Sequence, residues 1–223
     1  MLEEATRGSW TIEHVFVTSP ARERHRELLR RAAAEITELS ERAFASTANT
    51  ETPQNILALL RPREWSWNDL QKRETLLIIL DGVQDPGNVG TIVRSAEAFG
   101  ATGVVLLNGC ARVSNGKVLR ATAGSIFRMP FLEGISRDDL LAQVEAGGLR
   151  LFALTAHSEP ELAHSNLRTA CALLVGSEAA GVSTALLAKA EPISIPTATV
   201  ESLNAAVACS IALYEARRQR GGW

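Results

Sequence analysis

Residues able to bind a charged or polar ligand follow three apolar runs in the second half of the chain. The segments after these runs read DGVQDPGNVG, GSEAAGVS and PTATVESLN. An arginine suits a phosphate, and a carboxylate at the mouth of a loop can hold hydroxyls, amines or an arginine. The candidates in these segments and in the helices expected after them are Asn88, Arg94, Glu178, Ser202 and Asn204.

The three segments stand at the ends of predicted β-strands. Short apolar runs alternate with stretches of helical spacing, which indicates a parallel sheet with helices on both faces. Such sheets bind ligands beyond the carboxyl ends of their strands, where these segments lie. The expected strands are residues 76–80, 103–107, 151–155, 172–175 and 193–195. The expected helices are residues 89–99, 137–146, 183–190 and 202–218.

Most of these candidates also have a plain structural interpretation. Asn88 and Ser202 stand where side chains cap helix N-termini. Arg94 lies off the apolar stripe of its helix, where it can pair with Glu97 in water. Glycines of the second segment, Gly176 among them, let a ligand approach the backbone closely. A GxGxxG fingerprint is absent after the first run, which weakens the case for a nucleotide-dependent dehydrogenase.

The last expected helix carries both large and small apolar residues. Helical spacing predicts that its buried side consists of Leu203, Val207, Ala208, Ile211 and Tyr214. Small residues at neighbouring positions predict close helix packing, either within the chain or across a dimer.

The first part of the chain predicts a separate small α/β unit. An alternating run at residues 11–18 reads as a strand, and Ser-Pro at 19–20 starts a helix whose apolar spacing extends to Leu39. Residues 55–60 read as a second strand, and the polar stretch 61–74 as a linker. We therefore expect one domain over residues 1–70 and another over residues 75–223. In the linker, Trp65 and Trp67 either stack on a base or, as we favour, anchor the linker to a core.

Composition restricts the class of protein. The chain has 223 residues, of which 46% are hydrophobic, and a net charge of -2. This charge gives no general attraction to nucleic acid, so RNA binding would need local patches of positive charge. Three widely spaced cysteines without a CxxC pair favour a reduced cytoplasmic protein over a disulfide framework or a metal site. No apolar run long enough for a membrane span occurs in the sequence.

In their order and spacing, the three segments resemble the SpoU/TrmH-type RNA 2′-O-ribose methyltransferases of the SPOUT superfamily. DPGNVGTIVRSAEAFG is similar to the first family motif, LLVGSEAAGVS to the second and IPTATVESLNAAVACSIALYE to the third. GKVLRATAGSIFRMP matches a family segment between the first two, and the resemblance covers about residues 75–218. The segments LEEATRGSWTIEHVFVTSP and TETPQNILALL are similar, more weakly, to the ribosomal-protein-like substrate-binding domain of rRNA-directed members.

The resemblance implies a C-terminal trefoil knot, a homodimer, S-adenosyl-L-methionine as cofactor, no metal, and methyl transfer to a ribose 2′-hydroxyl in RNA. The N-terminal similarity favours rRNA over tRNA. The implied catalytic residues are Asn88, Arg94, Glu178, Ser202 and Asn204. The implied cofactor contacts are Gly176, Ile195 and Leu203. The candidates for binding RNA phosphates near the active face are Lys117, Arg120 and Arg128.

Two departures from the family pattern bear on function. In the third motif Thr197 replaces the usual Met, the following Gly is missing, and the loop is one residue short, which affects contacts to the adenine. The chain also begins after the basic N-terminal segment and first strand of relatives, so we expect either a truncated start or a different mode of RNA docking. The alternative function is a non-catalytic RNA- or cofactor-binding protein on the same fold.

Overall fold

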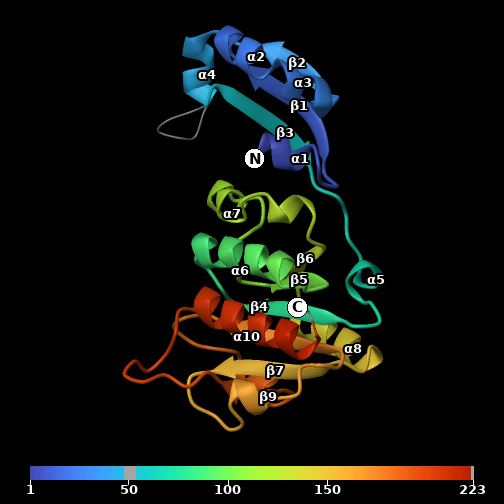
Figure 1. Cartoon of the computed structure of the whole chain (residues 1–223), viewed down its shortest axis with the longest axis vertical. Coiled ribbons are helices and arrows are strands. Elements are labelled where there is room, and N and C mark those ends of the chain that lie inside the picture. Colours follow the sequence, from blue (N-terminus) through green and yellow to red (C-terminus); the bar gives the residue numbers. More distant parts are fainter. Residues whose placement is uncertain (48–53, 222–223) are drawn as a thin grey trace. The chain divides into compact units, whose positions relative to one another are not determined.

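The structure, a computed structural model of the chain, describes residues 1–47 and 54–221. It divides into two compact units, Met1–Glu64 and Trp65–Trp223 (Figure 1). Residues 50–53 of the second N-terminal segment quoted above lie outside the described residues. None of the helices within the described ranges combines the length and apolarity needed to cross a bilayer.

The first unit contains a three-stranded mixed sheet in the order β2-β1-β3. β1 pairs in parallel with β2 and antiparallel with β3. Val15, Leu29 and Ala32 form its small core. The described elements of this unit are α1 (Leu2–Ala5), β1 (Thr11–Val17), α2 (Ser19–Arg24), α3 (Arg26–Ala32), β2 (Glu35–Glu38), α4 (Glu41–Thr47) and β3 (Ile56–Arg61).

The prediction of one helix extending to Leu39 is wrong. α3 ends at Ala32 because Ala33 adopts a left-handed conformation with φ of 49°. The chain then turns into β2, where Ile36 pairs with Val15. Apolar spacing alone does not reveal this break, since Ile36 packs against the same core from a strand as it would from a helix.

The second unit is built on a six-stranded parallel sheet in the order β6-β5-β4-β8-β7-β9. Its strands are β4 (Leu76–Asp81), β5 (Gly103–Leu107), β6 (Phe131–Ile135), β7 (Arg150–Thr155), β8 (Cys171–Gly176) and β9 (Glu191–Ser194). Its helices are α5 (Trp67–Leu70), α6 (Pro86–Ala98), α7 (Gly116–Ala121), η1 (Ser125–Phe127), α8 (Arg137–Ala146), η2 (Leu162–His164), α9 (Thr184–Leu187) and α10 (Ala205–Gln219). The predicted parallel α/β fold is confirmed.

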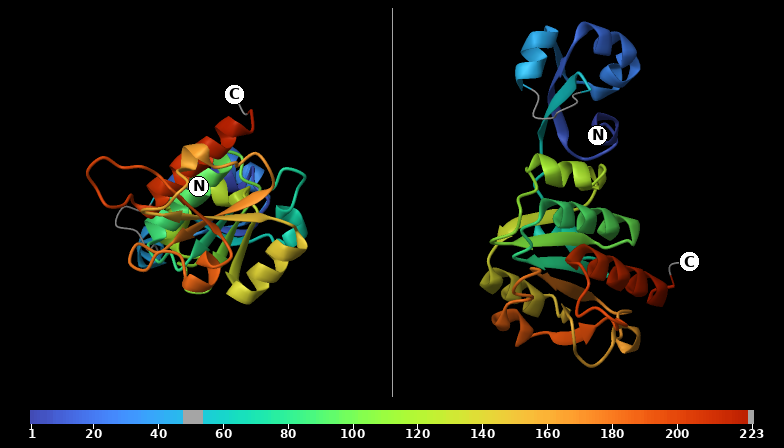
Figure 2. Two further views of the ribbon diagram at one scale, coloured as in Figure 1. Left: turned by 90° about the horizontal axis from the view of Figure 1, so that it is seen from below. Right: turned by 90° about the vertical axis from the view of Figure 1, so that its left-hand side faces the viewer.

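Helices cover both faces of this sheet. Leu70 of α5, Leu140 of α8 and Leu186 of α9 pack on one face, and Trp65 and Trp67 join the same cluster. The two tryptophans therefore anchor the linker to the core. On the other face α6 and α10 lie side by side (Figures 1 and 2).

Two elements of this unit, β6 and α7, were not predicted. The sequence of β6, FLEGI, is short and mixes apolar residues with Glu and Gly. The sequence of α7, GKVLRA, forms fewer than two helical turns.

The predicted buried side of the last helix is wrong. Val207, Ile211 and Tyr214 are 48%, 38% and 47% exposed and share one side of α10. The buried residues of this helix are Ala205, Ala206, Cys209, Ala212, Leu213 and Ala216. Mostly small side chains let α10 approach α6 and β8 closely, and this packing buries Leu213 but leaves Val207, Ile211 and Tyr214 facing outward.

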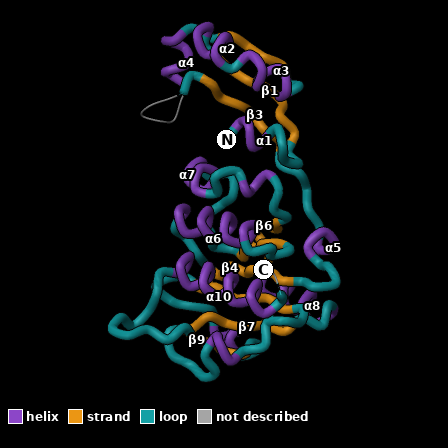
Figure 3. The backbone as a smooth tube through the Cα atoms, viewed as in Figure 1, coloured by secondary structure: helices purple, strands orange, loops and turns teal. Residues whose placement is uncertain are grey.

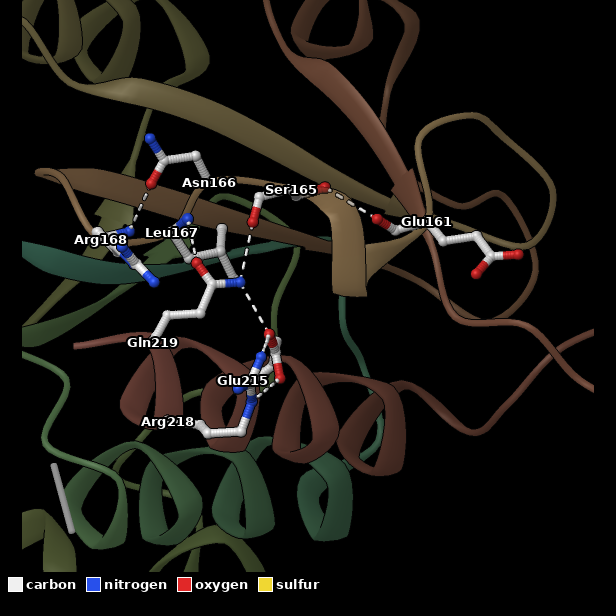
Figure 4. Close-up of polar contacts among 8 residues, drawn as sticks. All are labelled: Glu161, Ser165, Asn166, Leu167, Arg168, Glu215, Arg218 and Gln219. Carbon is white, nitrogen blue, oxygen red and sulfur yellow. Dashed lines mark hydrogen bonds and ion pairs between the residues drawn. The ribbon is translucent and has the colours of Figure 1, made fainter. Parts of the chain in front are cut away.

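The C-terminal end of α10 holds the connection between β7 and β8 (Figure 4). Gln219 accepts a hydrogen bond from the Leu167 backbone N–H at 2.9 Å and donates to the Ser165 carbonyl at 2.9 Å. Arg220 donates to four backbone carbonyls, those of Glu74, Thr75, Leu167 and Thr169. The bonds to residues 165–169 hold the second half of the loop between β7 and β8, and those to Glu74 and Thr75 hold the segment before β4.

Asp81 connects three elements at the carboxyl end of the central strand β4. Its buried carboxylate accepts hydrogen bonds from Arg137 Nη2 at 2.7 Å and from the Ser183 backbone N–H at 2.8 Å. Burial by itself raises the pKa of Asp81, but the bonds from Ser183 and Arg137 outweigh it, so the net pKa is lowered. Asp81 thus ties the start of α8 and the loop after β8 to the sheet.

We predict that Asp81→Asn lowers the free energy of unfolding by about 2 kcal/mol at neutral pH, because one of the two donors then faces an amide N–H₂. Because folding lowers the pKa of Asp81, its carboxylate contributes this stability in full above the unfolded-state pKa of about 3.9. The contribution is lost as the pH falls through the pKa of Asp81 in the folded protein. Urea unfolding at several pH values checks it. The exposed Glu145→Gln removes the same charge and should change stability by under about 0.5 kcal/mol. A loss for Asp81→Asn that persists unchanged in acid would contradict the prediction.

Candidate active site

A cavity of about 350 Å³ lies at the carboxyl edge of the parallel sheet. Segments after β7, β8 and β9 line it, together with the start of α10. Five of the predicted site residues lie in its wall, namely Gly176, Glu178, Ile195, Ser202 and Leu203. The connection from β9 to α10, which supplies the last three, is a long loop (Figure 3).

A chain of hydrogen bonds joins three of the predicted catalytic residues beside this cavity. Asn88 Nδ2 donates to Glu178 Oε1, and Asn204 Nδ2 donates to Asn88 Oδ1 at 3.0 Å. Asn204 Oδ1 accepts from the backbone N–H groups of Ala206 and Val207. Because a carboxylate only accepts and a backbone N–H only donates, both amides have one consistent orientation. The three segments singled out in the sequence therefore meet at one place.

The caps of the two helices differ from the sequence predictions. Asp85, not Asn88, caps α6, since its carboxylate accepts from the Asn88 backbone N–H at 2.8 Å. Asn204, not Ser202, caps α10. With the caps assigned elsewhere, the Asn88 side chain is available to Glu178 and the Ser202 side chain to the cavity.

Backbone crowding shapes the loop that carries Glu178. A Cβ atom added to Gly176 would lie 2.0 Å from the carbonyl carbon of Gly181, so only glycine fits there. Gly181 has φ of 65°, and its N–H donates to the Ser177 carbonyl at 2.8 Å. This tight turn holds Glu178 at the tip of the loop. The predicted close approach at Gly176 thus involves the protein's own chain.

The predicted cations differ in their surroundings. Arg94, Lys117 and Arg120 are exposed, and within the described ranges no hydrogen bond or ion pair holds their side chains. Arg94 lies six residues after Asn88 on α6 and takes no part in the hydrogen bonds that connect Asn204, Asn88 and Glu178. Lys117 and Arg120 lie on α7. This helix packs closely against α6 because Gly90 of α6 has no side chain, and a Cβ at Gly90 would lie 2.3 Å from Ala121 Cβ.

Arg128 is held by a carboxylate. Its guanidinium donates to both oxygens of Glu97, at 2.5 and 3.0 Å. Hydrogen bonds from Arg128 lower the pKa of Glu97 against the opposing effect of burial. The expected partner of Glu97 was Arg94, so the pairing differs, and Arg128 is less available to an RNA phosphate than Lys117 or Arg120.

Sequence reasoning missed two parts of the cavity. Leu154 and Thr155 at the end of β7 and Ala156 directly after it contribute to the wall. β7 ends at the same sheet edge as β8, so strand order would have indicated them. Glu201 is the second missed part, and it lines the cavity together with Thr197, which the sequence had already singled out for its effect on contacts to the adenine. Glu201 directly precedes the Ser-Leu-Asn segment, and this neighbourhood was the one sequence feature that could have indicated it as a site residue.

Comparison with known proteins places this geometry in a family. Residues 75–214 match the model of the SpoU rRNA methylase family, and residues 1–58 match that of the MRM3-like substrate binding domain. The chain belongs to the SpoU rRNA methylase family. The family predicted from the three segments is confirmed.

Individual relatives of the SpoU family are similar over most of the chain. The 23S rRNA (guanosine(2553)-2′-O)-methyltransferase RlmP of Bacillus subtilis (strain 168) is 36% identical over 80% of this chain and 71% of that protein. The 23S rRNA (uridine(2479)-2′-O)-methyltransferase of Streptomyces viridochromogenes is 33% identical over 76% of this chain and 62% of that protein. The crystal structure of the SpoU methyltransferase AviRb from Streptomyces viridochromogenes in complex with the cofactor AdoMet has a TM-score of 0.90 at 29% identity, over 98% of this chain and 87% of that one.

The cavity fits the cofactor of the SpoU family, S-adenosyl-L-methionine, and the predicted cofactor is confirmed. Its volume lies in the range of about 300–1,000 Å³ that holds small molecules. Leu154, Val175 and Ile195 offer apolar surface for a purine, and the carboxylates of Glu178 and Glu201 suit a positively charged group. Among the described residues, no group of three or more His, Cys, Asp or Glu side chains could hold a metal ion.

We predict that Asn204→Asp separates the two roles of this residue. Aspartate caps helices as well as asparagine, so stability should change by under about 0.5 kcal/mol, whereas Asn204→Ala should cost about 1 kcal/mol. Aspartate cannot donate to Asn88, so both variants should lower methyl transfer about 10²-fold. Thermal unfolding and single-turnover rates check these outcomes. Wild-type turnover in Asn204→Asp would show that the bond to Asn88 does not matter for catalysis.

Proposed function

We propose that this chain transfers a methyl group from S-adenosyl-L-methionine to a ribose 2′-hydroxyl of rRNA. The enzyme class and the cofactor follow from membership of the SpoU family. The observation that carries the catalytic proposal is the hydrogen-bond chain from Asn204 through Asn88 to Glu178 at the wall of the cavity. It joins the three motifs into one polar surface beside a cofactor-sized space.

Two observations support rRNA as the substrate. The relatives compared above are named as 23S rRNA methyltransferases. Residues 1–58 match a substrate binding domain, and we propose that residues 1–70 bind RNA while residues 75–223 carry catalysis. The two relatives act on guanosine and on uridine, so the base is left open. A ribosomal substrate would place the protein in the cytoplasm.

The protein's contribution to the reaction is alignment and help with one proton. The bound cofactor supplies a methyl group already activated on a sulfonium, which a ribose 2′-oxygen can attack in line. Holding the reacting atoms in near-attack geometry can be worth about 7–11 kcal/mol. Glu178 Oε2 makes no hydrogen bond to any described residue and can accept one from the incoming ribose or the cofactor. Asn88 fixes the direction of that carboxylate.

Arg94 is proposed to hold an RNA phosphate and stabilise the developing alkoxide. A guanidinium has a pKa above about 12, so it serves poorly as a base, and a phosphate oxygen or water is a better proton acceptor. The exposure of Arg94 and its lack of a protein partner among the described residues support this role. Lys117 and Arg120 on α7 likewise have no partner within the part of the chain that the structure describes, and we propose that they bind further phosphates. Ser202 lines the cofactor cavity.

A homodimer and a C-terminal trefoil knot are also proposed. The apolar side of α10, formed by Val207, Ile211 and Tyr214, supports the homodimer because it is exposed in the single chain. The knot is supported by the path of the chain. After β9 at the sheet edge it returns to pack α10 on α6 and β8, and the end of α10 is held by residues 165–169, which precede β8.

We predict that the chain transfers a tritiated methyl group from the cofactor to rRNA that lacks 2′-O-methylation, and that tRNA accepts none. Arg94→Ala should lower the single-turnover rate about 10²-fold or more. Arg94→Lys should retain part of the wild-type rate, because lysine keeps the positive charge but loses the bidentate geometry of the guanidinium. Cofactor affinity, measured separately by calorimetry, should be unchanged in both variants.

Three outcomes would count against this function. Tight cofactor binding without transfer to any RNA would favour the non-catalytic binding protein. Transfer to tRNA alone would overturn the choice of substrate. Wild-type rates in both Arg94 variants would remove Arg94 from the catalytic residues.

We predict that Ile211→Glu dissociates the homodimer, because it places a charge in the centre of the exposed apolar side of α10. Sedimentation velocity should then give the mass of a single chain, with the circular dichroism spectrum unchanged. Ala188→Glu, at an exposed position directly after α9, introduces the same single charge elsewhere and should leave the dimer intact. A wild-type protein that sediments as a monomer would rule out the homodimer.

A further inference from the structure

Among the described residues, two carboxylates line the cofactor cavity, and the protein holds only one of them by a hydrogen bond. Glu178 accepts a hydrogen bond from Asn88. Glu201 lies in the loop before α10, and its carboxylate makes no hydrogen bond or ion pair with any residue in the described ranges. A carboxylate without a protein partner in a ligand cavity is available to the ligand.

The charge of the wall is one-sided. The described residues that line the cavity include Glu178 and Glu201 and contain no lysine, arginine or histidine. Its remaining polar side chains are hydroxyls, those of Thr155, Ser177, Thr197 and Ser202 among them. An occupant therefore meets negative charge that no cation of the wall neutralises, and a cationic ligand is favoured over a neutral one of the same shape.

We infer that Glu201 makes the cavity select the cationic methyl donor over the neutral thioether left after transfer. This inference rests on the proposed function. The donor carries a sulfonium, and loss of the methyl group to the ribose oxygen leaves an uncharged sulfur. The adenosine and amino-acid parts of the two molecules are the same, so groups that contact only those parts cannot tell donor from product.

The position of Glu201 suits contact with the sulfur end of the ligand. It stands three residues before Asn204, which enters the hydrogen-bond chain to Glu178 where the methyl group must be transferred. The loop is drawn together by Thr197 Oγ1, which donates to the Val200 carbonyl at 2.5 Å. A carboxylate at this end holds the donor and releases the product, so it limits inhibition by accumulated thioether.

The expected effect is moderate and depends on salt. Glu201 is exposed at the mouth of the cavity, so water and ions weaken its attraction to the sulfonium. Loss of such a charge should weaken binding of the donor about fivefold. The same screening predicts that the preference of the wild type for the donor declines as ionic strength rises.

Calorimetry on the full chain tests this inference, with S-adenosyl-L-methionine and S-adenosyl-L-homocysteine as the two ligands. Glu201→Gln should weaken the donor about fivefold and change the product by less than about twofold. Glu145→Gln is the matched control, because it removes the same charge from an exposed position on α8 outside the cavity, and it should alter neither affinity. Glu201→Ala should behave as Glu201→Gln if charge and not hydrogen bonding is responsible.

Each result decides for or against the inference. Equal weakening of both ligands would overturn it, since Glu201 would then contact a part that they share. No change in either would make Glu201 a solvated surface residue and overturn it too. The inference is also overturned if the preference of the wild type for the donor does not decline as ionic strength rises. It is overturned as well if the two Glu201 variants keep that preference. Failure of the wild type to bind the donor at all would refute the proposed function itself.

Discussion

The amide of Asn88 is the contact on which the site depends. It belongs to the helix after the central strand, yet it bonds to the loop after the neighbouring strand β8 and to the first residue before α10. Parallel strands bring their carboxyl ends to one edge, so these segments approach each other in any such sheet. The Asn88 amide then fixes the relative positions of these segments, because Glu178 can only accept a hydrogen bond and the backbone N–H groups at the start of α10 can only donate one.

Close backbone packing makes this convergence possible. Gly176 and Gly90 stand where a single added carbon would collide with neighbouring backbone or side chain, one in the loop of Glu178 and the other between α6 and α7. The alanine-rich side of α10 works in the same way against α6 and β8. Burial of these small residues carries a consequence for assembly, since the larger apolar side chains of α10 then remain exposed on the single chain.

Charge is divided between the cavity and the surface around it. The wall of the cavity carries only carboxylates among its described ionisable residues, whereas Arg94, Lys117 and Arg120 are exposed on α6 and α7 without protein partners in the described ranges. This division reconciles a net charge of -2 with an RNA substrate. A cationic cofactor and an anionic RNA backbone favour charges of opposite sign, and separate acidic and basic groups supply both without strong net charge.

The sequence by itself determined the parallel α/β class, the family and the segments that form the site, because apolar alternation and turn residues are local properties and three motifs in fixed order are specific. It gave strand 103–107 and helix 137–146 with the bounds that the structure has. Only the tertiary structure decided that Asp85 and Asn204 are the caps, that Ile36 belongs to a strand, which side of α10 is buried, and that Glu201 reaches the cavity. The caps are local bonds, but neighbouring polar side chains offer the same local sequence more than one cap, and only the folded backbone selects Asp85 and Asn204. The other three outcomes depend on which distant segment a residue meets, and the local sequence is compatible with either outcome until packing selects one.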